Sequence, residues 1–230
     1  MTLFIISDLH GHFTVTKKAL EEKGFEEGNM DHHLLCLGDY FDRGDENQAV
    51  YEYLRSLNDQ ATFILGNHDL FLLEFLEGDF SKADFNATHN GFDKTLEDFS
   101  GMNYDPLKLD AIYKAIHKTY PNLLNWLKSM PLYIETDEYI FTHGGIDITL
   151  DDWRKQDRKS FVWNYQSSLK PHPKKTIVVG HERTKFIRLK RMKPTNTPYD
   201  IIYDDNVIHI DPFVEESKMM NVLVLNETIK

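Results

Sequence analysis

Five short polar clusters hold the side chains of this 230-residue chain that could do chemistry, and each cluster follows an apolar run. The clusters are rich in carboxylates and imidazoles, and one of them adds an amide. They are Asp8-Leu9-His10, 38–44 (GDYFDRG), 66–69 (GNHD), His143-Gly144-Gly145 and Gly180-His181. Mixed oxygen and nitrogen ligands suit manganese, iron or zinc, and they differ from a thiolate site. The residue types therefore indicate a metal centre built from several distant segments.

Six of these side chains could hold two divalent metal ions. Asp8 and His10 are two residues apart on an extended segment, so both can turn toward a first ion. Asp39 can bridge two ions through its two carboxylate oxygens. Two ions about 3.5–4 Å apart can activate a bridging hydroxide for in-line attack on phosphorus. The remaining ligands of the second ion would be Asn67, His143 and His181.

Three further residues could handle the proton and the phosphate. His68 follows a metal-ligand candidate, so its ring can point away from the metals and toward a leaving group. Imidazole titrates in the range that general acid catalysis at neutral pH requires. Asp42 can orient His68 and keep it protonated, as the third member of a triad orients the base. Arg43 offers a planar guanidinium group that matches phosphate oxygens.

The apolar runs before the clusters predict the strands that position them. Short, continuous, β-rich runs are typical of buried strands, and these cover 3–6, 34–37, 63–65, 139–141 and 177–179. If these strands are parallel neighbours, their carboxyl ends share one edge, where open α/β sheets place their sites. Helical spacing fills the gaps at 13–22, 46–57 and 70–76. This alternation predicts an α/β layered fold.

The remaining segments extend this layered arrangement. Residues 79–130 are polar and mostly helical, with the best helices at 107–118 and 121–129, and we interpret them as a helical insertion between two core strands. Residues 185–198 are basic and rich in turn formers, which favours a hairpin or a mobile loop. Further strands are expected at 200–203, 207–210 and 221–225, and His209 in one of them is an additional candidate for contact with the site.

Composition excludes several other classes of protein. The formal net charge of -11 argues against a protein that coats nucleic acid, since duplex nucleic acid is held mainly by basic surfaces. The single cysteine, Cys36, excludes an internal disulfide framework and suits a reducing compartment. No signal peptide or membrane-spanning run is apparent. We therefore expect a cytoplasmic protein without nucleic-acid or membrane partners, whose partner is a phosphorylated substrate.

The ordered motifs resemble the calcineurin-like metallophosphatase superfamily. The similarity lies in the branch that holds phosphoprotein phosphatases, phage-type bacterial Ser/Thr phosphatases and symmetrical diadenosine tetraphosphatases. The matching text from residue 3 to about 181 is DLHG at 8–11, GDYFDRG at 38–44, GNHD at 66–69, HGG at 143–145 and GH at 180–181. The resemblance implies a metallophosphatase fold, in which two mixed β-sheets pack as a sandwich flanked by helices in α-β-β-α layers. A single domain would then span residues 1–230.

The resemblance also implies a role for each matching residue. The first metal ion would be bound by Asp8, His10 and Asp39, and the second by Asp39, Asn67, His143 and His181. The expected ions are manganese, with iron or zinc as alternatives. His68 with Asp42 would be the general acid, and phosphate would be held by Arg43, Asn67 and His68.

This sequence departs from the branch at its phosphate contacts. Positions that carry arginine in the protein phosphatases and in the phage-type enzymes are here Leu65 and Tyr165, and the Ile-Asp-Thr-Gly motif of relatives appears as 210–213 (IDPF). Arg183, close behind His181, could substitute for a missing arginine. The Asp of GNHD and the segment 126–132 are closer to the dinucleoside-polyphosphate enzymes than to the protein phosphatases.

We therefore expect a dinuclear metal-dependent phosphatase, a hydrolase that acts on phosphoric ester bonds. A metal-bridging hydroxide would attack phosphorus directly, because the clusters contain no serine or cysteine nucleophile. The favoured substrate is a phosphomonoester, as for Ser/Thr protein phosphatases. One alternative is a symmetrical dinucleoside tetraphosphate hydrolase. Another is a catalytically weak binding scaffold on the same fold.

Overall fold

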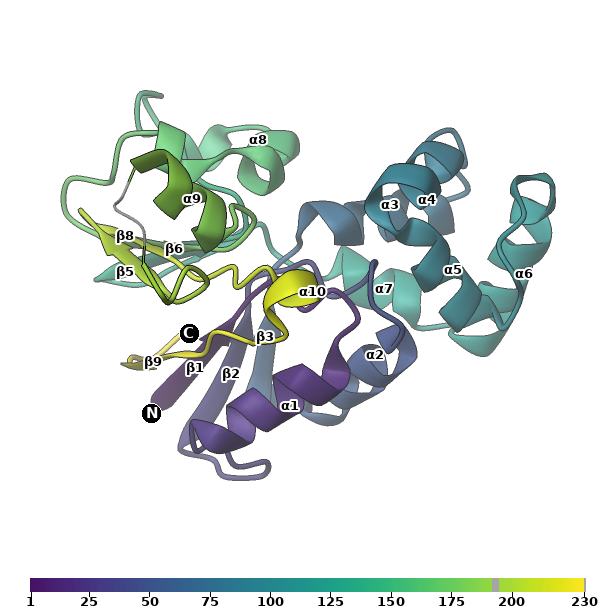
Figure 1. Ribbon diagram of the computed structural model, residues 1–230, viewed down its shortest axis with the longest axis horizontal. Helices are drawn as coiled ribbons and strands as arrows, with labels where there is room; N and C mark the ends of the chain where they lie inside the picture. Colours follow the sequence, from purple (N-terminus) through teal and green to yellow (C-terminus); the bar gives the residue numbers. More distant parts are fainter. Residues whose placement is uncertain (192–194, 230) are drawn as a thin grey trace.

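The first of two β-sheets is built around the N-terminus of the chain (Figure 1). The computed structural model describes residues 1–191 and 195–229. The strand order is β3-β2-β1-β9, with β1, β2 and β3 parallel and β9 antiparallel to β1. The bounds of these strands are Thr2–Ile6 for β1, His32–Cys36 for β2, Ala61–Phe63 for β3 and Leu223–Asn226 for β9.

The second sheet has the strand order β4-β5-β6-β8-β7. Its three central strands β5, β6 and β8 run parallel, and the two outer strands are antiparallel to their neighbours. The bounds are Tyr133–Glu135 for β4, Tyr139–Thr142 for β5, Thr176–Val179 for β6, Ile202–Asp204 for β7 and Val207–His209 for β8. Both sheets are thus mixed, as the resemblance implies.

The two sheets pack face to face through alternate residues of their central strands. Leu3 and Ile5 of β1 lie in one buried cluster with Phe141 of β5 and Val178 of β6. Phe4 and Ile6 point to the other face, because successive side chains of a strand alternate, and they pack beneath the helices. Both faces of β1 are therefore buried, which explains its continuous apolar run.

Helices cover the outer faces of this sandwich (Figure 1). Helices α1 and α2 lie against the first sheet, and α8 packs on the second sheet through Phe161 and Val162. The expected α-β-β-α layers are confirmed. The helices outside residues 79–130 are α1 (Phe13–Glu22), α2 (Asn47–Ser56), α3 (Asn67–Leu76), α8 (Arg158–Trp163), α9 (Thr184–Arg191) and α10 (Val214–Ser217).

Residues 79–130 form four helices that share the apolar core of the first sheet. Their bounds are Ala83–Asn90 for α4, Phe92–Ser100 for α5, Leu109–Thr119 for α6 and Leu123–Lys128 for α7. Phe99 and Trp126 of this segment pack edge-on against Phe41, which belongs to the GDYFDRG loop. The segment is therefore in direct contact with a loop that carries candidate site residues.

The five apolar runs divide between the two mixed sheets that the resemblance implies, with the first three in one sheet and the last two in the other. One prediction from the sequence is wrong. The predicted hairpin or mobile loop at 185–198 begins as helix α9, which ends at Arg191; residues 192–194 lie outside the described part of the chain. Residues 184–191 contain no glycine or proline, and three basic side chains in the last turn suit the negative end of a helix dipole.

Helix lengths in this fold are modest. Within residues 1–191 and 195–229, no helix is both long enough and apolar enough to cross a bilayer.

Candidate metal centre

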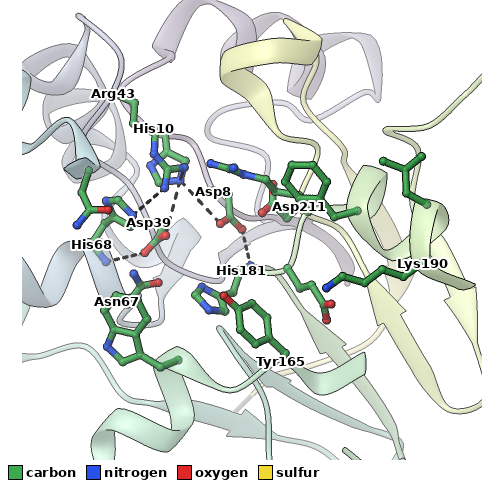
Figure 2. A pocket seen from close by; sticks show the side chains of 16 residues that line it. Asp8, His10, Asp39, Arg43, Asn67, His68, Tyr165, His181, Lys190 and Asp211 are labelled. Carbon is green, nitrogen blue, oxygen red and sulfur yellow. Dashed lines mark hydrogen bonds and ion pairs between the residues drawn. The ribbon is translucent and has the colours of Figure 1, made fainter. Parts of the chain in front are cut away.

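The carboxyl ends of strands from both sheets meet at one edge of the sandwich, where a cavity of about 620 Å³ opens (Figure 2). The loop after β1 carries Asp8 and His10, and the loop after β2 carries Asp39. Asn67 and His68 begin helix α3. His143 directly follows β5, and His181 follows β6. The structure therefore brings together all six candidate ligands, although they come from two sheets.

Asp39 lies at the centre of this group with its two carboxylate oxygens facing different imidazoles. Its Oδ2 is 3.7 Å from Nε2 of His10, and its Oδ1 is 3.4 Å from Nε2 of His143. The carboxylate is buried. One oxygen is thus available to each half of the site, as a bridge between two ions requires.

The first half of the site presents one oxygen of Asp8 and one nitrogen of His10 to each other. Nδ1 of His10 lies 2.9 Å from the carbonyl oxygen of Phe41, so this nitrogen donates and Nε2 keeps its lone pair. Oδ2 of Asp8 accepts the hydroxyl of Ser7 and the backbone N–H of His181. Its Oδ1 lies 4.0 Å from Nε2 of His10, which accepts from Nη1 of Arg43 at 2.6 Å. A cation bound by Oδ1 of Asp8 and Nε2 of His10 would replace this contact with Arg43.

The second half contains two imidazole nitrogens and an amide oxygen that can offer lone pairs to one cation. Nδ1 of His143 donates to the carbonyl of Leu37 at 2.8 Å, so a neutral ring turns the lone pair of Nε2 toward Oδ1 of Asn67 at 2.9 Å. Nε2 of His181 is buried and has no hydrogen-bond partner among the described residues. Buried polar atoms are rarely left unpaired. A divalent cation would satisfy all three atoms, so the residues fit a metal site.

Shifts in pKa agree with this assignment. Burial and then the charge of Arg43 hold the pKa of His10 well below its usual range. Burial and then His143 lower the pKa of His181 to about 3. Both rings are therefore neutral, which is the form that binds metal. Burial disfavours a charge on His143, but the carboxylate of Asp39 outweighs it and raises the pKa of His143 to about 10. A metal ion would replace that proton.

His68 points its ring toward the same cavity but is held from outside the metal group. Its Nδ1 lies 2.6 Å from Oδ2 of Asp42, and its Nε2 lies 2.9 Å from a guanidinium nitrogen of Arg43. The hydroxyl of Thr95 donates to the other oxygen of Asp42. Nε2 is therefore the nitrogen that can meet a substrate, while Asp42 and Thr95 fix the ring.

His68 also lies close to two of the candidate metal ligands. Its ligand atom lies within 4.8 Å of those of His10 and Asp39, so distance alone would admit it as a metal ligand. The Asp42 contact favours a role beside the metal group, because the carboxylate at Nδ1 orients the ring as the third member of a triad does.

Both candidate phosphate arginines line the cavity, and a carboxylate connects them. Oε1 of Glu215 accepts from Arg43 at 3.0 Å and from Arg183 at 2.6 Å. The guanidinium of Arg183 also lies 3.8 Å above the ring of Phe213. Arg183 thus lies beside Arg43. The sequence alone indicated Arg183 as a substitute for a missing phosphate arginine only because it is close to His181 in the chain.

The backbone of the site residues is strained. Among the described residues, ten that are not glycine have a positive φ, and six of these belong to the candidate site: Asp8, His10, Asp39, Asp42, Arg43 and His181. Such conformations cost about 1–3 kcal/mol each and persist only where surrounding contacts enforce them. Asp69 supplies part of that enforcement, since its carboxylate accepts the backbone N–H groups of Asp39, Tyr40 and Gly66.

One glycine shows how closely the two halves approach. A Cβ atom at Gly180 would lie 1.9 Å from the hydroxyl of Ser7 and 2.3 Å from Oδ2 of Asp8. No larger residue fits there without moving the β1 loop.

Several site residues were missed in the sequence. Thr95 and Glu215 carry no motif, because their roles depend on partners far away in the chain. Asp211 borders Asp8 in the cavity, and burial followed by the charge of Asp8 raises its pKa well above the usual range (Figure 2). His209, in contrast, is buried in β8 and is not among the residues that line the cavity.

The two residues that stand where relatives carry arginine, Leu65 and Tyr165, lie in different surroundings. Leu65 is buried in the core of the first sheet, away from the cavity. Tyr165 lines the cavity, and its ring stacks on His181 at a centroid distance of 5.0 Å. The aromatic ring therefore stands where a phosphate contact was expected.

Comparison with known proteins agrees with this geometry. The sequence profile of the calcineurin-like phosphoesterase family matches residues 1–210. The chain belongs to this family. The family implies divalent metal ions, and the His/Asp groups described above could hold them. The resemblance stated from the motifs is thus confirmed.

Curated relatives carry the name symmetrical bis(5'-nucleosyl)-tetraphosphatase. The protein of Glaesserella parasuis is 30% identical over 148 residues, which cover 64% of this chain and 45% of the relative. That of Psychromonas ingrahamii is 29% identical over 180 residues, which cover 77% and 55%. The chain spans about half the length of the curated relatives it matches.

Solved structures share the fold at low sequence identity. A cold-active protein-tyrosine phosphatase of a Shewanella species has a TM-score of 0.58 at 17% identity, covering 99% of this chain and 76% of that one. A protein serine/threonine phosphatase of Saccharomyces cerevisiae has a TM-score of 0.53 at 15% identity, covering 97% and 67%. At these identities the likeness concerns the fold.

Proposed function

We propose that this chain is a dinuclear metal-dependent phosphoesterase that hydrolyses dinucleoside tetraphosphates. The observation that carries the reaction class is the position of Asp39, whose two oxygens face His10 on one side and His143 on the other. This carboxylate lies between two sets of candidate ligand atoms, one on each side. The proposed ligands are Asp8, His10, Asp39, Asn67, His143 and His181.

Each remaining side chain of the site would have its own role in hydrolysis. The chemistry that a pair of divalent ions supplies is polarisation of phosphoryl oxygens and activation of water. Arg43 would orient the phosphate through its planar guanidinium group. His68 would pass a proton from Nε2 to the leaving oxygen, and Asp42 at Nδ1 would orient its ring. Arg183 would contact a second phosphoryl group.

The aromatic wall of the cavity supports a nucleotide substrate. Trp163 and Tyr165 line the cavity and are 36% and 52% exposed, so their rings are accessible to a ligand there. Tyr165 is backed by the ring of His181, so its free face is held flat. Nucleobases stack on such faces with about 1–3 kcal/mol per base. The names of the curated relatives point in the same direction.

We also propose that residues 1–230 work as one metallophosphatase domain in which segment 79–130 supports the site. The carbonyl of Gly91 accepts the backbone N–H of Arg43 at 3.1 Å, and Thr95 holds Asp42. A Cβ atom at Gly91, where φ is +76°, would lie 2.7 Å from the backbone nitrogen of Arg43. The segment thus contacts the loop that orients both the proton donor and the phosphate.

A comparison of substrates tests the proposal. The manganese-loaded protein is incubated with diadenosine tetraphosphate, p-nitrophenyl phosphate and a phosphoserine peptide, and products are separated by chromatography. We expect diadenosine tetraphosphate and one water to give two ADP, with a kcat/KM at least about tenfold above that for the peptide. Asp39→Asn is the control without catalysis.

Other outcomes decide between the alternatives. Faster cleavage of the phosphopeptide would overturn the nucleotide assignment and support the phosphomonoesterase predicted from the sequence. About two bound ions without cleavage of any substrate would overturn the enzyme and support a binding scaffold.

A further inference from the structure

Glu215 occupies an unusual position beside the phosphate arginines. It lies in the short helix α10, which ends at Ser217, and its Oε1 accepts from both Arg43 and Arg183. Its Oε2 is buried and has no partner among the described residues. Two cationic side chains from segments about 140 residues apart are thus joined by a single carboxylate.

Contacts of the neighbouring residues hold Glu215 at the two arginines. Phe213, two residues before Glu215, has a positive φ of 53°, and Arg183 lies on its ring. These contacts hold Glu215 close to the arginines even though one of its oxygens is unsatisfied. Two guanidinium groups would present two positive charges to a substrate, and Glu215 reduces the sum to one.

The charge of a phosphate depends on its place in a molecule. A terminal phosphomonoester carries about -1.5 to -2 at neutral pH. An internal phosphate, bonded to two bridging oxygens in a diester or an anhydride, has one ionisable oxygen and carries a single charge. Repulsion by a nearby carboxylate grows with the charge of the approaching group, so it opposes the terminal phosphate more strongly.

We propose that Glu215 is a specificity-determining residue that favours singly charged internal phosphates over doubly charged terminal phosphates. The inference rests on the proposed function, since it supplies the reason why the site would attack an internal phosphate of a dinucleoside tetraphosphate. Glu215 does not touch the reacting atoms in this account. It acts through the two arginines and through its own charge.

The test removes the negative charge of Glu215 and keeps the size and shape of its side chain. Glu215→Gln is compared with Glu216→Gln, because Glu216 is the neighbouring acid and pairs instead with Lys185 and Tyr199. The manganese-loaded full chain is assayed with p-nitrophenyl phosphate, which is doubly charged, and with bis-p-nitrophenyl phosphate, which is singly charged. Calorimetry measures the binding of inorganic phosphate, and thermal unfolding monitors the fold.

Glu215→Gln is expected to raise kcat/KM for the monoester by roughly tenfold while the diester changes by less than about threefold. Inorganic phosphate should bind roughly tenfold more tightly to this variant. Glu216→Gln should leave all three quantities unchanged. The ratio of monoester to diester activity is the decisive readout, because a loss of structure would lower both activities together.

Two results would overturn the inference. Equal changes for monoester and diester would make Glu215 a structural residue, as would a monoester activity that falls. Failure of the proposed function is recognised separately. If the wild-type protein cleaves neither compound, phosphate binding still tests Glu215, and unchanged affinity in Glu215→Gln contradicts its role.

Discussion

The part of the site that follows the first sheet, here the first half, differs from the part that follows the second sheet, the second half, in how completely its polar atoms are satisfied. The loops after β1, β2 and β3 supply Asp8, His10, Asp39 and His68, and the buried side-chain atoms of these residues have partners within the described chain. In the second half, His181 and Glu182 line the cavity and each has a buried atom without a partner among the described residues.

This difference suggests that one half of the site holds catalytic groups in place and that the other half recognises the ligand. The first half is fixed by internal hydrogen bonds and by a strained backbone, as metal and proton chemistry at fixed geometry require. The second half has groups that a ligand would complete. Tyr165 and the residues 210–213, which depart from the relatives, belong to this second half. We infer that the first half determines the reaction and the second half determines the substrate.

The largest effect should come from Asp39, the residue shared by both halves. Asp39→Asn removes the charge that attracts two ions, so we expect less than one bound ion per chain and a kcat/KM at least about 10³-fold lower. Elemental analysis and p-nitrophenyl phosphate hydrolysis measure the two quantities. Asp45→Asn, an exposed acid in the same region, is the control. Full metal content in Asp39→Asn would break the assignment of the bridge.

His68 tests whether the first half contains a proton donor separate from the metal ligands. His68→Asn should keep both ions and lower kcat by about 10²–10⁴-fold on poor leaving groups. The loss should be smaller with p-nitrophenyl phosphate, whose leaving group needs little protonation. His89→Asn, in exposed helix α4, serves as the control. An emptied metal site would show instead that His68 is a ligand.

Tyr165 tests the second half. Tyr165→Ala should raise KM for diadenosine tetraphosphate by about tenfold because one stacking contact is lost. Hydrolysis of p-nitrophenyl phosphate should change by less than about twofold, and metal content should stay constant. Tyr165→Phe keeps the stacking face and should match the wild type. If Tyr165→Ala lowers both activities equally, the ring only supports His181.

The smallest effect on activity is expected at His209, which belongs to neither half of the site. Neither of its ring nitrogens has a hydrogen-bond partner within residues 1–191 and 195–229, and His209 does not line the cavity. Its burial should therefore affect stability and leave catalysis unchanged. Burial lowers its pKa to about 4. As the pH falls from 7 to 5, His209 becomes protonated in the unfolded chain and stays neutral in the folded chain. The free energy of unfolding therefore falls by about 2 kcal/mol.

Urea denaturation of the metal-free protein at a series of pH values measures this dependence. His209→Leu should flatten the slope of unfolding free energy against pH between 7 and 5, while His89→Gln, in the exposed part of α4, should not change it. An unchanged slope in His209→Leu would show that this ring does not titrate as inferred.

The sequence by itself determined which residues are candidate metal ligands. Ligand types, their order and the apolar runs before them are local features, and a buried strand such as β1 is recognised from its own continuous apolar run. Asp8, His10, Asp39, Asn67, His143 and His181 could therefore be predicted as one group, together with the α/β class. The same local signals placed helix α1 at 13–22 with the bounds that the structure has.

Only the tertiary structure decided how the strands divide between two sheets and which distant groups touch. Glu215 meets Arg43 across 172 residues, and Thr95 meets Asp42 across 53, and neither pair leaves a periodic or spacing signal in the chain. Helix α9 was missed because its basic residues resemble a solvated loop until Ile187 is packed beneath them. Contacts of this kind arise from the closure of the two sheets around the site, so they exist only after the chain has folded.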